Sequence, residues 1–75
     1  MAISRNQPRY VLAVGDASDE VAGHDGVALI GRLDRVVLVE TSLSMAAELR
    51  RAFRPHVHVY DSEKAARAAL ALFQP

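Results

Sequence analysis

The distribution of apolar and polar residues predicts a small sheet with helices packed on it. Residues 36–39, Val-Val-Leu-Val, form an unbroken aliphatic run, which is typical of a strand buried on both faces. Thr41, Ser42 and Ser44 follow with hydroxyls that can cap a helix, and apolar residues then recur at helical spacing up to Phe53. We therefore expect a central strand followed by an amphipathic helix, and the other elements have to cover that strand.

Two further segments precede this unit. Residues 9–15, RYVLAVG, form another strand that is apolar on both faces, and Gly15 and Asp16 end it. A short helix should begin there, capped by Asp16 or Ser18. The segment 18–33 then admits two interpretations.

One interpretation is a single long helix over residues 18–33. Each glycine inside it would cost about 1 kcal/mol relative to alanine. We therefore prefer a short helix ending near His24, a turn at Asp25-Gly26 and a strand at residues 27–30, which pairs with the central strand as a hairpin. The long helix stays open as the alternative.

The C-terminal part repeats the order of helix, strand and helix. A helix over residues 42–54 is stopped by Pro55. Residues 56–60, HVHVY, alternate between valines on one face and His56, His58 and Tyr60 on the other, as in a half-exposed edge strand. A last helix, over residues 63–73, ends before Pro75.

The last helix is apolar over an unusually wide angle. A surface helix needs an apolar stripe only about 100° wide, but alanine, leucine and phenylalanine cover more than half of this helix. It should pack broadly on its own sheet or contact a second chain. The candidate interaction surface consists of Ala66, Ala69, Leu70, Leu72 and Phe73.

Because the inner strands are apolar above and below, both faces of the sheet need cover. The first two helices can cover one face, and the last helix, or its copy from a partner, can cover the other. We predict an α/β domain of the α+β sandwich type, ferredoxin-like βαββαβ with an added C-terminal helix.

Composition narrows the class of protein. The chain has 75 residues, enough for one domain with a thin core, and dimerisation would bury more surface. No cysteine is present, and nine basic residues balance nine acidic ones, so nothing indicates a disulfide framework, a nucleic-acid partner or an anionic membrane. Residues 1–8 should be a flexible lead, residues 9–75 the domain, and the location cytoplasmic.

Histidines and acids offer two candidate metal sites. His56 and His58 share a strand face and could bind one metal with a third ligand from His24 or from a second copy. The alternative is two half-exposed histidines on an edge strand that bind nothing. A second candidate is the group of Asp16, Asp19, Glu20, Asp25 and His24, which is equally explained by a helix N-terminus and a turn. We predict neither a metal nor a cofactor.

The remaining chemistry is sparse. Arg50, Arg51 and Arg54 could bind phosphate or simply form a solvated helix face. Glu40, followed by two hydroxyl residues, is similar to a ligand-binding strand end of open α/β sheets. No glycine-rich phosphate loop precedes a helix, and no Ser–His–Asp set is indicated, so we do not expect an enzyme.

The order of elements across residues 9–60 resembles the βαββαβ prosegment and inhibitor domains of subtilisin-type proteases. The matching stretches are RYVLAV, the pair ALIGRL and RVVLVET, the helix SMAAELRRAF, and HVHVYDS. Such domains are folding chaperones and inhibitors that lay the sheet on the enzyme and thread an extended C-terminal tail into its cleft. Here the predicted helix over residues 63–73 takes the place of that tail, so no functional residue is carried over.

The stretch VVLVETSLSMAAELRRAFRPHVHVYDSEKAARAAL is also similar to two other families. It resembles the opening of a response-regulator receiver domain, with Glu40-Thr41 where that family has a pair of acids. It also resembles the closing strands and helices of an anti-sigma-factor antagonist domain. The phosphoacceptor aspartate of the first family and the phosphorylatable serine segment of the second have no counterpart, so both resemblances imply architecture rather than activity.

The sequence thus favours a small non-catalytic protein-interaction module of unknown partner that self-associates as a homodimer. One alternative is a protease-prosegment-like inhibitor or intramolecular chaperone. Another is a small-ligand or metal-binding domain that acts through His56, His58 or the strand end at Glu40.

Overall fold

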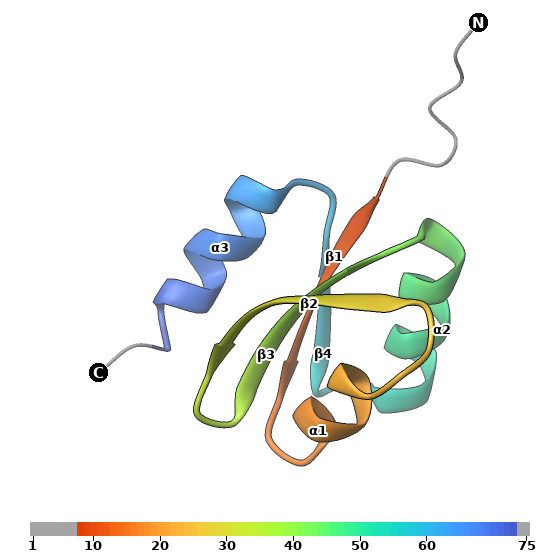
Figure 1. Ribbon diagram of the computed structural model, residues 1–75, viewed down its shortest axis with the longest axis horizontal. Coiled ribbons are helices and arrows are strands. Elements are labelled where there is room, and N and C mark those ends of the chain that lie inside the picture. Colours follow the sequence, from red (N-terminus) through yellow and green to blue (C-terminus); the bar gives the residue numbers. More distant parts are fainter. Residues whose placement is uncertain (1–7, 74–75) are drawn as a thin grey trace, which may run out of the picture.

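Four strands and three helices make up the part of the chain that the computed structural model describes, residues 8–73 (Figure 1). The predicted flexible lead, residues 1–8, lies outside the described residues except for Pro8. In chain order the elements are β1 (Arg9–Val14), α1 (Ala17–Ala22), β2 (Val27–Leu33), β3 (Val36–Thr41), α2 (Leu43–Phe53), β4 (Val57–Tyr60) and α3 (Glu63–Ala71).

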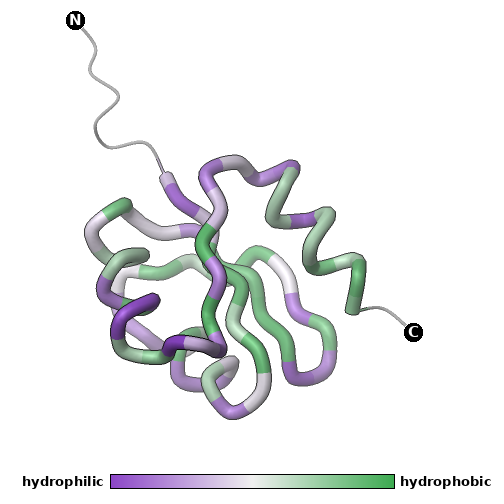
Figure 2. Tube along the Cα trace, turned by 180° about the vertical axis from the view of Figure 1, so that it is seen from behind, coloured by the Kyte–Doolittle hydropathy of each residue, from purple (hydrophilic) through white to green (hydrophobic). Residues whose placement is uncertain are grey.

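The strands form one sheet in the order β2-β3-β1-β4, and every neighbouring pair is antiparallel. With two helix crossovers this is the ferredoxin-like βαββαβ arrangement, and α3 is the added C-terminal helix. The prediction of the fold class is confirmed. The two strands expected to be buried on both faces, β1 and β3, lie at the centre, and apolar residues run along both (Figure 2).

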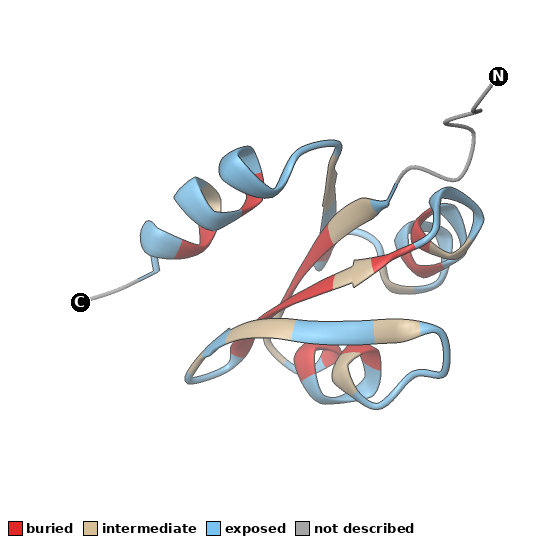
Figure 3. Cartoon of the chain, turned by 45° about the horizontal axis from the view of Figure 1, so that its top comes forward, coloured by how far each residue is buried: buried red, intermediate tan, exposed pale blue. Residues whose placement is uncertain are grey.

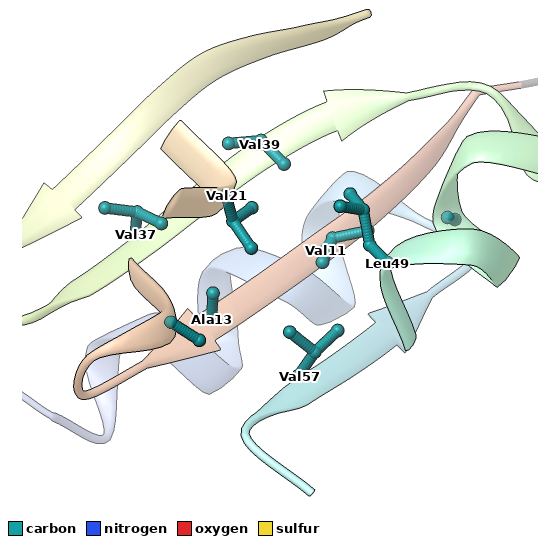
Figure 4. Packing of buried hydrophobic residues seen from close by; sticks show 9 residues of the cluster. Val11, Ala13, Val21, Val37, Val39, Leu49 and Val57 are labelled. Atoms are coloured by element: carbon teal, nitrogen blue, oxygen red, sulfur yellow. The ribbon is translucent and has the colours of Figure 1, made fainter. Parts of the chain in front are cut away.

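Beneath α1 and α2, the side chains of one sheet face form the larger core (Figure 4). Successive residues of a strand point to opposite faces, so alternate positions of β1, β3 and β4 meet these helices. Burying one valine or leucine side chain contributes about 1.5–3 kcal/mol. The cluster consists of Val11, Ala13, Ala17, Val21, Val37, Val39, Ala46, Leu49 and Val57.

The other sheet face is covered by α3 of the same chain (Figure 3). Leu12 and Leu38, at the centre of the sheet, pack with Ala66 and Leu70 of α3. The expectation that the last helix covers this face is confirmed. Its partner is the sheet of its own chain, because Ala66 is fully buried and Leu70 is only 9% exposed.

Residues 18–33 adopt the short helix followed by a strand, so the long-helix alternative is wrong. Asp25-Gly26 lies between them, and Gly26 has a φ of +87°, a value that helical backbone excludes. Thr41 donates its hydroxyl to the carbonyl oxygen of Gly26 at 2.6 Å, which ties this turn to β3. The strand runs to Leu33, beyond the predicted residues 27–30, because a β-bulge shifts its register and lets pairing continue.

Hydroxyl caps begin two of the helices. The Ser42 side chain accepts from the backbone N–H of Met45, as predicted, and Ser62 does the same for α3. The predicted side-chain cap of α1 is wrong. Asp16 makes no cap hydrogen bond and pairs with Arg35 instead, while Ser18 donates its hydroxyl to the carbonyl oxygen of Gly15 at 2.8 Å.

Candidate functional site

The most distinctive surface lies between α2 and β4. Leu43, Ala47 and Arg50 of α2 and the C-cap residue Arg54 follow one another at intervals of three or four residues, so they lie along one side of the helix. The helix is joined to β4 by a short turn, so the two elements run in opposite directions side by side. The arginine end of this stripe therefore lies beside the start of β4, and the Leu43 end lies toward its finish.

Two adjoining hollows open along this stripe, with volumes of about 370 and 390 Å³. The two hollows share lining residues of α2 and β4, and we call them together the α2–β4 groove. Arg50, Arg54 and Val59 line both hollows; Leu43, Ala46, Ala47 and Arg51 complete the first, and Pro55, Val57, His58 and Tyr60 the second.

The charges of the groove are available to a ligand. Arg50, Arg51 and Arg54 are exposed, and within residues 8–73 no carboxylate forms an ion pair with them. Other arginines are engaged, since Arg32 binds Asp19 at 2.8 Å and Arg67 binds Glu63 at 2.6 Å. The groove thus concentrates positive charge on a chain whose formal net charge is zero.

The outer side of β4 presents free backbone groups. The backbone N–H of Val14 donates to the carbonyl oxygen of His56, while that of Gly15 donates to Arg35 beside β3. Because backbone groups alternate in direction along an antiparallel strand, His58 and Tyr60 bond to β1 and the N–H and C=O of Val57 and Val59 point outward. No strand of the described chain lies on that side.

The opposite edge of the sheet, β2, is less suited to pairing. Its register shifts between Leu29 and Gly31, and such a bulge interrupts the even spacing of outward backbone groups. β4 keeps a regular register with β1 throughout. Of the two edges, β4 is therefore the better template for an added strand.

Of the predicted histidine pair, His58 lines the groove. His56 and His58 are both exposed, and His58 points to the α3 side of the sheet, since it is opposite Leu12 of the α3-facing core. His24 follows α1, which covers the other face. Between residues 8 and 73, no three histidine or acidic residues come together in an arrangement that could hold a metal ion.

The acidic segment around α1 is engaged in ion pairs. Asp16 pairs with Arg35, and Asp19 with Arg32, so two of the proposed cation ligands instead bind arginines of the β2–β3 hairpin. These contacts fasten α1 to the hairpin at the surface.

Glu40 is half-buried within β3, directly opposite Tyr10 on β1. Desolvation raises the pKa of the Tyr10 phenol, and the nearby carboxylates of Glu40 and Glu63 raise that pKa further. Glu40, Thr41 and Ser42 also line a shallow hollow of about 420 Å³ at this end of the sheet. Among residues 8–73, none that lines it is an arginine or a lysine that could hold an anion.

The candidate interaction residues of α3 divide into two groups. Ala66 and Leu70 belong to the core of the chain itself, and Ala69 is half-buried beside them. Leu72 and Phe73 follow the end of the helix and are 84% and 48% exposed. Only these last two leave substantial apolar surface.

Sequence reasoning noted the arginine run and the edge strand separately but missed that they face each other. It also missed Leu43 and Ala47, because they looked like parts of an amphipathic helix. The available signal was the short connection through Pro55, which requires α2 and β4 to be neighbours.

No family model matches this chain, and neither a curated protein nor a solved structure matches it. From Pro8 to Phe73, the chain contains no helix with the length and apolar character required to cross a membrane.

Proposed function

We propose that the protein is a non-catalytic interaction module that binds an extended, acidic segment of a partner protein along β4. The observation that supports this is the juxtaposition of outward backbone groups at Val57 and Val59 with the unpaired arginines of α2. An extended segment would add a fifth strand, and its backbone hydrogen bonds would supply affinity. Arginine–carboxylate contacts would select acidic side chains.

Charge favours such a partner over a second copy of this chain. A two-fold pairing of β4 with β4 would bring the arginines of two α2 helices toward each other, and like charges in proximity disfavour association. An acidic segment reverses the sign of this interaction. Self-association at β4 is therefore an outcome that the experiments below would detect.

The first experiment measures amide hydrogen exchange by NMR with the peptides TETETET and TKTKTKT, both acetylated and amidated. We expect TETETET to slow exchange at the Val57 and Val59 amides, because they gain hydrogen-bond partners. The His58 amide points toward β1 and serves as the internal reference. Binding without any change at Val57 and Val59 would contradict strand addition.

Arginine variants test the charge contribution. Arg50→Gln and Arg54→Gln should each weaken TETETET binding about fivefold, the effect of losing about 1 kcal/mol at an exposed ion pair. Arg35→Gln is the matched control, because it removes the same charge from the β2–β3 turn. If all three variants bind equally, or if inorganic phosphate binds the groove and the peptide does not, the proposal fails.

The protease-inhibitor alternative gains no support from the fold. The prosegment resemblance implies a sheet laid on the enzyme and an extended C-terminal tail. Here helices lie over both faces of the sheet, and residues 63–71 are helical.

A further inference from the structure

The α2–β4 groove is not uniform along its length, and this has a consequence for the order of residues in its ligand. Its arginines lie beside the start of β4, whereas Leu43, 51% exposed, lies at the other end of the α2 stripe. Resting on the proposed function, we infer that the bound segment runs antiparallel to β4 and carries an apolar residue before two acidic residues at alternate positions, in the order Φ-x-E-x-E.

The spacing of the acidic residues follows from that of the arginines. Arg50 and Arg54 are four residues apart on one side of a helix, which places their Cα atoms about 6 Å apart along the axis. Alternate residues of a strand are about 6.8 Å apart and point to the same face. Two acidic side chains separated by one residue can therefore each reach one arginine.

The same ligand residues make both kinds of contact. In an antiparallel ladder, a β4 residue whose backbone N–H and C=O point outward forms hydrogen bonds with the ligand residue directly opposite. The side chains of these two residues point to the same face of the sheet. Val57 and Val59 belong to the core beneath α2, so the residues opposite them point toward α2. The ligand residue between them lies opposite His58. Its side chain points to the same face as His58, and its backbone N–H and C=O point away from β4.

The direction of the ligand follows from the direction of β4. The strand runs from the arginine end of the groove toward the Leu43 end, so an antiparallel segment meets Leu43 first and the arginines afterwards. Antiparallel addition also continues a sheet in which every described pair is antiparallel, the slightly more stable mode of pairing. An apolar residue opposite the end of β4 covers Leu43.

The test compares TLTETET with its reversed sequence TETETLT, which has the same composition and charge, by NMR titration of the intact chain. We expect TLTETET to bind about fivefold more tightly, and Leu43→Ser to reduce this difference. In TLTETET, N-methylation of either glutamate should abolish binding, whereas N-methylation of the threonine between them should not.

The possible results separate the two proposals. Equal binding of the two peptides, or tighter binding of TETETLT, would overturn the order of residues inferred here and leave the acidic-segment function standing. Failure of both these peptides and TETETET to bind would overturn the function itself. Sensitivity to N-methylation at every position alike would contradict the two-residue period that the antiparallel ladder requires.

Discussion

Gly31 of β2 lies against the side chain of Leu70 from α3, and its missing side chain makes room for that contact. A Cβ atom at this position would stand 2.9 Å from the Cδ2 atom of Leu70, closer than van der Waals contact permits. That methyl group is the end of a flexible side chain, so it can turn away from one added carbon. A branched side chain needs more room.

We therefore expect Gly31→Ala to be tolerated and Gly31→Val to destabilise the fold by about 1–3 kcal/mol, the range typical of overpacking. Urea denaturation measures the difference. Ala28→Val is the matched control, because Ala28 is exposed on the same strand. If the cost of Gly31→Val is the same in a Leu70→Ala background, Leu70 is not its cause.

At the scale of elements, α3 covers one face of the sheet, and only a few of its side chains make this contact. Ala66 is fully buried and Ala68 is exposed, although they are two residues apart on the same helix. Ala66→Asp should cost several kcal/mol, because it places a carboxylate against Leu12 and Leu38. Ala68→Asp should change the free energy of unfolding by no more than about 0.5 kcal/mol.

Thermal melts of the two variants decide the role of α3. If Ala66→Asp melts at the temperature of Ala68→Asp, α3 does not hold this face in solution. Increased binding of a hydrophobic dye by Ala66→Asp would then show that the helix has detached while the sheet stays folded.

The elements themselves were largely predictable from sequence. The aliphatic runs of β1 and β3, which are apolar on both faces, require two covering layers, and this correctly placed α3 opposite α1 and α2. The full length of β2 was not predictable, because a bulge depends on pairing with β3 rather than on local pattern. The failed cap at Asp16 has a similar cause, since a distant partner, Arg35, engages its carboxylate.

At the scale of the whole molecule, the candidate site arises from segments whose patterns carry no common signal. The arginine run of α2 is typical of a solvated helix face, and the residues of β4 are typical of an edge strand. Only the sheet order, which leaves β4 at the edge beside α2, turns the two into one groove. Interactions set by topology in this way lie beyond the reach of periodicity and composition.

The wide apolar angle of the last helix predicted self-association, but little of that apolar surface is left exposed for a second copy. Ala66 and Leu70 are used within the chain, and Leu72 and Phe73 remain as exposed apolar side chains. The two apolar side chains that this end of the chain leaves exposed fall well short of the about 800 Å² that each partner of a stable dimer buries. We therefore expect the protein to sediment as a monomer at micromolar concentration and to dimerise only at higher concentration.

Sedimentation velocity across a concentration series tests this expectation. Leu72→Ser/Phe73→Ser should abolish the dimer, whereas Ala71→Ser, at the exposed end of the same helix, should not. A dimer that is stable at micromolar concentration and survives the double variant would require another surface. The outer side of β4 would be the first surface to examine. If two copies pair there, Arg54→Glu should strengthen the dimer, because it relieves repulsion between like charges. That result would replace the acidic partner segment with a second copy of this chain.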